Sequence, residues 1–315
     1  MSLNLGVHLG QQNLSMGEMR TAWRRFDAAG MDWISVWDHI YEAPPAGGTI
    51  DHFEAVSTLG ALCADTTNAR IGCLVFYVGY RNPALLAKTA STLDHISNGR
   101  FELGIGGGWH EQEATAYGYD FPPVGKRLDM LEEAAPLIRS LLDEERTTFD
   151  GTWFRTADAS NRPRPVQGRL PLWIGGKGEK RTLPLAARYA DGWNAAYVSA
   201  AEFGRLNGVL DEACERQGRD PGTIKRGINL QFTLGADAAQ ADRQREALIE
   251  QWGAQADRVL AGALLGTPDD VAEQVAAYHE AGADDLNIAL RAPWSIEALD
   301  AYIDDMVPVL RRRSN

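Results

Sequence analysis

The pair Asp38-His39 is the first place in the sequence where a proton could be transferred. It ends the apolar run Trp33–Trp37, which predicts a buried strand. A histidine exchanges protons near neutral pH, and a neighbouring carboxylate can orient its ring. The alternative interpretation is structural: Asp38 caps a helix and His39 is incidental, because adjacent strand positions point to opposite faces. Taken alone, the pair favours the structural interpretation.

The second candidate is a glycine-rich segment, Gly175-Gly176-Lys177-Gly178, closely followed by Lys180 and Arg181. Glycines leave backbone N–H groups accessible, and a helix that begins here would add the positive end of its dipole; both favour a bound phosphate. The three cations would strengthen that site. A glycine-rich loop with solvated lysines is the alternative, because the spacing matches neither the dinucleotide fingerprint nor the P-loop.

A third group of residues follows the apolar run Arg100–Gly106. Gly106, Gly107 and Gly108 suit either the close approach of a flat ligand or a tight turn. Trp37, Trp109 and Trp193 fall at expected strand ends, where an aromatic side chain could line a cofactor pocket. The next residues, His110-Glu111-Gln112-Glu113, predict the first turn of a helix. No metal-ligand spacing such as H-E-x-x-H is present, and no G-x-S-x-G elbow.

Repeated strand–helix alternation positions these residues. The predicted strands are Leu3–Leu9, Trp33–Trp37, Arg70–Phe76, Arg100–Gly106, Leu172–Gly175, Gly192–Tyr197, Ile228–Leu234 and Asp285–Leu290. The main predicted helices are Ser15–Ala29, Phe53–Ala64, Asn82–Ile96, Arg127–Leu142, Lys180–Tyr189, Ala201–Gln217, Asp237–Gly253, Pro268–Ala281 and Ile296–Leu310. This alternation predicts a closed (β/α)8 TIM barrel, with a doubly wound open sheet as the alternative.

The barrel would form a single domain over residues 1–315, with an insertion at about 144–171 between strands four and five. Thr147–Thr156 within that insertion predicts a hairpin with Asp150-Gly151 at its turn. In a barrel of this type, functional residues cluster at the C-terminal ends of the strands. The three candidate groups would therefore meet at one mouth.

Composition narrows the partners. The chain has 43 acidic and 31 basic residues and a net charge of −12, which argues against nucleic acids and anionic membranes as partners but leaves room for a local basic pocket. Cys63, Cys73 and Cys214 are too few and too far apart for a disulfide or zinc framework. Without a recognisable signal peptide or long apolar run, we expect a cytoplasmic chain.

Several long motifs, in order, resemble the bacterial-luciferase-like family of flavin and deazaflavin oxidoreductases, and most nearly its coenzyme F420-dependent branch. They cover nearly the whole chain and comprise Asn82–Ala90, Ser97–Glu111, Pro171–Leu183, Ala190–Asn194, Gly266–Pro268 and Ala281–Asp284. The resemblance implies a (β/α)8 barrel with the cofactor ring in its mouth. The implied activity is hydride transfer between C5 of the deazaflavin and a small organic substrate, with a homodimer as the expected assembly.

The resemblance also implies roles for individual residues. His39 would lie beside the ring and donate or accept a proton, while Asp38 would position His39 or contact the ring. Cys73, Leu74 and Val75 would lie behind the ring, with a non-proline cis peptide bond between Leu74 and Val75. Gly106–Gly108 would face the cofactor, and Gly175–Gly178 would bind its phosphate. Lys177, Lys180 and Arg181 would then bind the carboxylates of the F420 tail.

One departure from the family pattern bears on the substrate. Sugar-phosphate dehydrogenases of this family place a glutamate just after the fourth-strand glycines, where this chain has Trp109. Tryptophan cannot transfer a proton, and simple alignment places Glu111 and Glu113 too far along the chain to substitute. Three alternatives stay open: an FMN-dependent monooxygenase that needs a partner flavin reductase, a non-catalytic cofactor-binding barrel, and a metal-dependent hydrolase.

Overall fold

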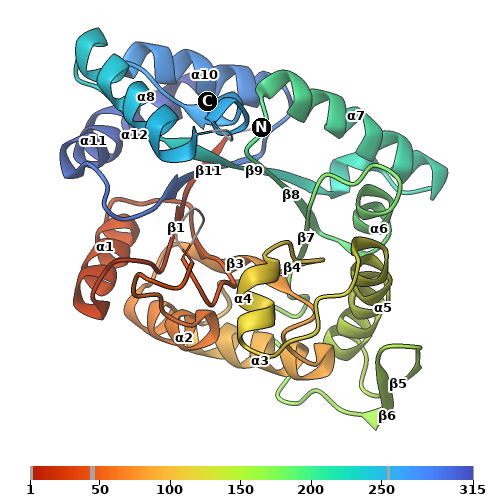
Figure 1. Cartoon of the computed structure of the whole chain (residues 1–315). Coiled ribbons are helices and arrows are strands. Elements are labelled where there is room, and N and C mark those ends of the chain that lie inside the picture. Colours follow the sequence, from red (N-terminus) through yellow and green to blue (C-terminus); the bar gives the residue numbers. More distant parts are fainter. Residues whose placement is uncertain (1–2, 43–46, 254–255, 315) are drawn as a thin grey trace.

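The computed structural model describes residues 3–42, 47–253 and 256–314. Within these residues, eight parallel strands close into a barrel in the order β1-β2-β3-β4-β7-β8-β9-β11, and β11 pairs with β1 (Figure 1). Closure confirms the predicted (β/α)8 barrel and excludes the open sheet. The strands are β1 (Asn4–Leu9), β2 (Trp33–Val36), β3 (Arg70–Tyr77), β4 (Phe101–Gly106), β7 (Leu172–Gly175), β8 (Gly192–Ala196), β9 (Lys225–Phe232) and β11 (Asp285–Leu290).

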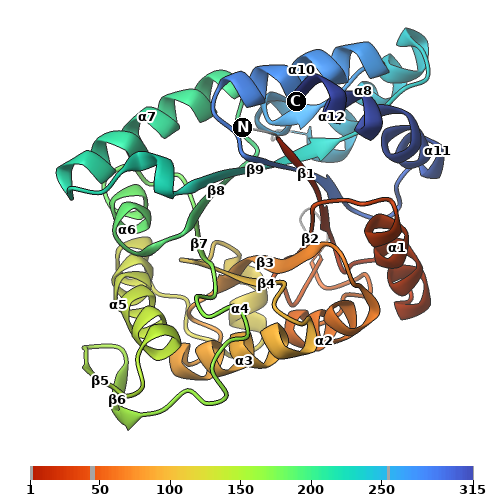
Figure 2. The ribbon, with the colours of Figure 1, turned by 180° about the vertical axis from the view of Figure 1, so that it is seen from behind.

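Helices cover the outside of the barrel, and α4 lies across one mouth, in front in Figure 1 and behind in Figure 2. The α-helices are α1 (Met16–Ala28), α2 (Ala55–Asp65), α3 (Pro83–Ile96), α4 (Glu111–Ala116), α5 (Val124–Asp143), α6 (Thr182–Tyr189), α7 (Ala200–Arg216), α8 (Ala238–Trp252), α9 (Ala256–Ala261), α10 (Pro268–Glu280), α11 (Ile296–Asp300) and α12 (Val307–Ser314). The 3₁₀ turn η1 (Pro221–Thr223) and the π-helical turn η3 (Ala301–Met306) complete the helical elements described.

Local sequence signals account for several of these boundaries. Ser15 and Glu18 form the capping box that begins α1, and the Asn82 side chain caps α3 with Pro83 in its first turn. The predicted hairpin is present as β5 (Thr147–Asp150) and β6 (Arg155–Ala159), which project from the barrel (Figure 1).

Four elements differ from expectation. β9 begins at Lys225 rather than Ile228, because its polar start pairs with β8 at Gly192. The short α9 and β10 (Ala263–Leu264) lie in a stretch with no clear sequence period. The predicted last helix is interrupted by the π-helical turn η3.

Glycines and tryptophans fill the barrel interior together. The rings of Trp33 and Trp173 pack against each other with centroids 4.7 Å apart. A Cβ at Gly192 would lie 2.4 Å from the Trp173 ring, and one at Gly72 would lie 3.2 Å from Trp33 Nε1. Small residues on some strands therefore make room for large residues on others, which is the layered packing of a filled barrel.

A charged cluster lies beside these tryptophans. Arg70, at the start of β3, pairs with Glu102 and Asp285, and Trp173 Nε1 donates to Glu102 at 2.6 Å. These residues lie near the N-terminal ends of their strands. Side chains thus fill the barrel at the N-terminal ends of its strands. A ligand cavity can form only at the C-terminal ends.

Candidate active site

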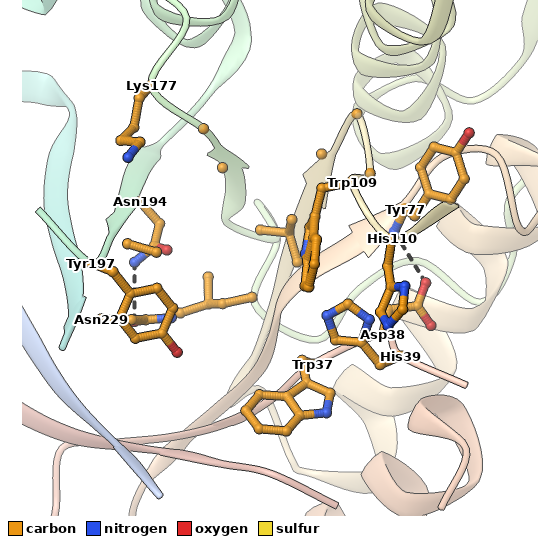
Figure 3. Close-up of a pocket in the computed structure, with 18 of the residues that line it drawn as sticks. Trp37, Asp38, His39, Tyr77, Trp109, His110, Lys177, Asn194, Tyr197 and Asn229 are labelled. Carbon is orange, nitrogen blue, oxygen red and sulfur yellow. Dashed lines mark hydrogen bonds between the residues drawn. The ribbon is translucent and has the colours of Figure 1, made fainter. Parts of the chain in front are cut away.

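A cavity of about 480 Å³ opens at the C-terminal ends of the strands. Every barrel strand, or the loop directly after it, contributes to its lining. The contributions are His8, Trp37–His39, Leu74–Val75 and Tyr77, Gly106–His110, Gly175–Lys177, Asn194 with Ala196–Tyr197, Asn229 and Arg291. Figure 3 shows Trp37, His39, Trp109 and His110 on one side and Lys177, Asn194, Tyr197 and Asn229 on the other.

His39 forms the central contact of the first side. Its Nδ1 lies 2.7 Å from Oε1 of Glu113, which is the residue that simple alignment placed too far away. That expectation was wrong in space, because the chain after β4 turns back over the mouth and α4 brings Glu113 to the loop after β2. Glu113 also accepts hydrogen bonds from the backbone N–H groups of Ile40 and Tyr41 and from the Tyr80 hydroxyl.

These hydrogen bonds determine which ring nitrogen of His39 carries a proton. Burial raises the pKa of Glu113, but His39 and the backbone donors outweigh it and lower that pKa to about 2. The carboxylate is therefore ionised at neutral pH and accepts a proton from Nδ1. In neutral His39 the lone pair is consequently on Nε2, the atom available to a ligand.

Aromatic rings surround His39. The Trp109 ring lies 5.2 Å from it edge-on, and the His110 ring lies 5.6 Å away. Trp109 stacks on His110 at 4.9 Å and is 59% exposed, so it lies at the solvent-exposed edge of the cavity. Nε2 of buried His110 has no hydrogen-bond partner among the described residues.

Asp38 has a different partner from the one expected. Its two carboxylate oxygens each lie 2.7 Å from Nη1 of Arg81, and Oδ2 accepts from the Tyr77 N–H at 3.0 Å. Burial raises the pKa of Asp38, and the Arg81 guanidinium opposes that rise. Asp38 makes no hydrogen bond to His39, so within the described residues Glu113, and not Asp38, orients the imidazole. Asp38 still lines the cavity.

The end of β3 forms part of the cavity wall. The Leu74–Val75 peptide bond is cis, as the resemblance implied, and the β3–β4 register shifts between Cys73 and Phe76. A Cβ at Gly106 would lie 2.6 Å from Val75 Cγ2, and one at Gly175 would lie 2.8 Å from Val75 Cγ1. These two glycines therefore make room for Val75. Cys73 is fully buried and lies outside the cavity lining.

Only part of the basic segment reaches the cavity. Gly175, Gly176 and Lys177 line it, whereas Gly178, Lys180 and Arg181 do not. Arg181 instead pairs with Asp129 and Glu132 of α5, both at 2.6 Å, because α5 packs beside α6 and presents two carboxylates. Of the three cations that were expected to bind the cofactor tail, only Lys177 lines the cavity. Arg258 lies near Lys177 and also lines the cavity, although the sequence did not indicate it.

Trp193 also departs from expectation. It is fully buried and stacks on Phe203 at 5.5 Å, with Nε1 donating to the Gly176 carbonyl. Its neighbour Asn194 takes the cavity position, and Asn194 Nδ2 donates to Asn229 Oδ1 at 3.2 Å (Figure 3). Successive side chains of a strand point to opposite faces of the sheet. Because Trp193 points away from the barrel interior, its neighbour Asn194 points into the cavity.

His8 of β1 is a buried residue of the cavity lining. Its Nδ1 lies 2.9 Å from the Ser35 hydroxyl, and burial, with Arg291 nearby, lowers the pKa of His8 to about 3. His8 is therefore neutral. In the part of the chain that the structure describes, no three His, Cys, Asp or Glu side chains gather as a metal site.

Comparison with known proteins identifies the family. Residues 2–285 match the model of the luciferase-like monooxygenase family. The chain belongs to this family. An uncharacterised protein of Mycobacterium tuberculosis is 35% identical over 223 residues, which cover 71% of this chain and 72% of that protein.

Two named enzymes are also similar. The F420-dependent glucose-6-phosphate dehydrogenase of Kineococcus radiotolerans is 31% identical, with 76% of this chain and 70% of that protein covered. A solved F420-dependent secondary alcohol dehydrogenase, in complex with an F420-acetone adduct, superposes with a TM-score of 0.86 at 20% identity, covering 98% and 99% of the two chains. Both are enzymes, and the prediction that this chain is an enzyme is confirmed. No helix in the described residues is long and apolar enough to span a membrane.

Proposed function

We propose that this chain is a coenzyme F420-dependent oxidoreductase that transfers a hydride to or from a small organic substrate. The observation that carries the proposal is the His39–Glu113 pair beside a large open cavity at the barrel mouth. The names of the similar enzymes support F420 as the cofactor. An FMN-dependent monooxygenase is the alternative, because the family is described as luciferase-like monooxygenases and a solved Baeyer-Villiger monooxygenase of the same fold is in complex with FMN.

The lining fits a cofactor of this kind. Leu74, Val75 and the backbone of Gly106–Gly107 form a wall for a ring, and Lys177 and Arg258 provide positive charge for an anionic tail. Neither cation has a carboxylate within ion-pair distance among the described residues. Gly175 and Gly176 would hold the phosphate, next to the loop that leads into α6. Bound there, F420 would supply the hydride donor or acceptor at C5.

The protein's own part is proton transfer at His39. When a substrate alcohol loses a hydride from carbon, Nε2 accepts the hydroxyl proton; when a C=O or C=C bond gains a hydride, Nε2 returns a proton. Glu113 keeps Nδ1 protonated throughout, so it acts as a positioning residue. The Trp109 and His110 rings pack against the His39 ring and hold it in place.

A titration of the apoprotein with F420 and with FMN tests the cofactor. We expect F420 to bind, and tight binding of FMN with no affinity for F420 would overturn the choice. H39A tests the mechanism: turnover should fall about 10²- to 10⁴-fold while the F420 dissociation constant stays nearly unchanged. Unchanged turnover in H39A would remove His39 from the reaction.

The remaining expectations are part of the same proposal. We propose a single-domain, cytoplasmic enzyme that acts as a homodimer on a small molecule. Light scattering coupled to size-exclusion chromatography measures the assembly directly, and a monomer at assay concentration would contradict it.

A further inference from the structure

Arg291 brings a guanidinium into the cavity, and none of the acidic side chains that the structure describes forms an ion pair with it. It follows β11 and lines the same cavity as His39. Its Nη2 donates to the Tyr197 hydroxyl at 3.0 Å, and Nη1 donates to Gln231 Oε1 at 3.4 Å; both acceptors are neutral. Its Nε is buried and has no hydrogen-bond partner among the described residues. The charge of Arg291 is therefore not compensated by this part of the chain.

Three aromatic rings lie close to the guanidinium. Its Cζ lies 5.4 Å from the ring centroid of Trp37, 5.3 Å from that of Tyr197 and 5.1 Å from that of Trp252. Aromatic faces attract a cation and exclude water, but they do not neutralise it. Arg291 is partly buried, and a cation that is partly removed from water gains from an anion beside it. The surroundings therefore favour an anion that arrives with a ligand.

Tyr197, which accepts a hydrogen bond from Arg291, has an unusual backbone conformation. Tyr197 has φ of 54°, a left-handed conformation that a bulky residue seldom adopts. This conformation accompanies the hydrogen bond from Arg291 to its hydroxyl. Local strain of this kind is found most often at ligand sites, where the surrounding structure maintains it.

The other charges of the cavity do not compete for this role. Glu113 is bound to His39, and Asp38 is bound to Arg81, so both lining acids already have partners. Lys177 and Arg258 lie near each other and serve the cofactor tail in the function proposed above. Arg291 contacts Trp37 instead, whose ring centroid is 6.0 Å from that of His39. Among the described residues that line the cavity, Arg291 is thus a cation one aromatic ring away from His39 to which the proposed function assigns no ligand.

We propose that Arg291 binds a carboxylate of the substrate, so that the substrates are small organic acids. The planar fork of a guanidinium matches the two oxygens of a carboxylate. Because Trp37 contacts both Arg291 and His39, a carboxylate on Arg291 leaves the rest of a small molecule beside His39. This assignment of substrate class rests on the proposed function, but the binding site itself does not.

Calorimetric titration with benzoate tests the site at neutral pH and constant ionic strength, with benzamide as the neutral probe of the same shape. Each probe is titrated into the wild-type protein with and without saturating F420. We expect benzoate to bind and benzamide to bind at least about tenfold more weakly, because one charge-assisted pair is lost. R291Q should weaken benzoate binding by a similar factor. R216Q, which removes an exposed arginine on α7, should leave it unchanged.

The outcomes separate this inference from the proposed function. Loss of benzoate binding in R291Q, with the F420 dissociation constant unchanged, supports the site. If R291Q weakens F420 as much as benzoate, Arg291 belongs to the cofactor and the inference is overturned. Equal binding of benzoate and benzamide, or tighter binding of phenyl phosphate than of benzoate, overturns the carboxylate assignment. Failure of F420 to bind at all contradicts the proposed function, while benzoate binding to the apoprotein still decides the role of Arg291.

Discussion

Glu113→Gln preserves the size of the side chain and removes its charge. In the structure both carboxylate oxygens face donors: Oε1 accepts from His39 and Tyr80, and Oε2 accepts from the N–H groups of Ile40 and Tyr41. A glutamine must place its NH₂ group against one of these pairs. Against Ile40 and Tyr41 it would lose two hydrogen bonds, because a backbone N–H group cannot accept one. Against His39 and Tyr80 it would keep both only if the ring changes its tautomer and the hydroxyl turns, and in either orientation the negative charge is lost.

The free energy of unfolding should fall measurably in E113Q. With the NH₂ group against Ile40 and Tyr41, two lost bonds to a buried charged group at roughly 1.5–3 kcal/mol each amount to about 3–6 kcal/mol. The pKa of Glu113 falls from its ordinary 4.5 to about 2, and that difference corresponds to about 3 kcal/mol of folding free energy. At roughly 2.1 cal/mol/K of unfolding entropy per residue, 3 kcal/mol lowers the Tm of 315 residues by about 5 °C.

The loss of stability in E113Q should depend on pH. Because folding lowers the pKa of Glu113, its contribution is complete above pH 4.5 and disappears as pH falls to about 2. The Tm difference between wild type and E113Q should therefore be largest near neutral pH and should shrink through that window. Circular dichroism melts across a pH series measure it. E111Q, which changes an exposed glutamate at the start of the same helix, is the matched control.

Activity should respond as well. An amide NH₂ turned toward Nδ1 would favour the opposite tautomer of His39 and remove the lone pair from Nε2, lowering kcat by about 10²- to 10⁴-fold. If E113Q keeps both the melting temperature and the turnover of E111Q, Glu113 does not orient His39 and the reasoning is wrong.

Two further predictions concern the cavity wall and the cofactor tail. G106A should destabilise the fold by about 1–3 kcal/mol, because its Cβ would overlap Val75. The control G208A lies in open space on α7 and should stabilise the fold by about 0.5–1 kcal/mol. Denaturant unfolding of both variants measures the two changes. K177A should weaken F420 binding about two- to fivefold at low salt and less at high salt. K225A, at the other end of the barrel, should leave F420 binding unchanged. Fluorescence titration at two salt concentrations measures both variants, and an equal effect of the two would contradict the prediction.

The sequence was sufficient to predict the barrel because its periodicity is local. Runs such as Leu172–Gly175 and Asp285–Leu290 were predicted to the residue, since both are short, apolar and bounded by turns. The cluster of candidates at one mouth followed from the fold. His39, Lys177, Gly106–Gly108 and Gly175–Gly176 do line the cavity there.

Side-chain pairing was less predictable, because it depends on how loops return across the mouth. Glu113 reaches His39 only because α4 folds back over the barrel, and Arg181 is drawn to α5 by carboxylates far away in sequence. Arg291 carries no local signal of its own. Only the nearby rings of Trp37, Tyr197 and Trp252 distinguish it from a surface arginine.

The contribution of every barrel strand to the cavity links ligand binding to the integrity of the whole ring. A chain that has formed only half of its strands has only part of the lining, so a partly folded intermediate should have little affinity for the ligand. A ligand that binds only the closed barrel adds its full binding free energy to the last step of assembly. At a free concentration of 100 times its dissociation constant, that gain is about 2.7 kcal/mol. Cofactor supply would then influence how much of the newly made chain survives, as well as how much is active.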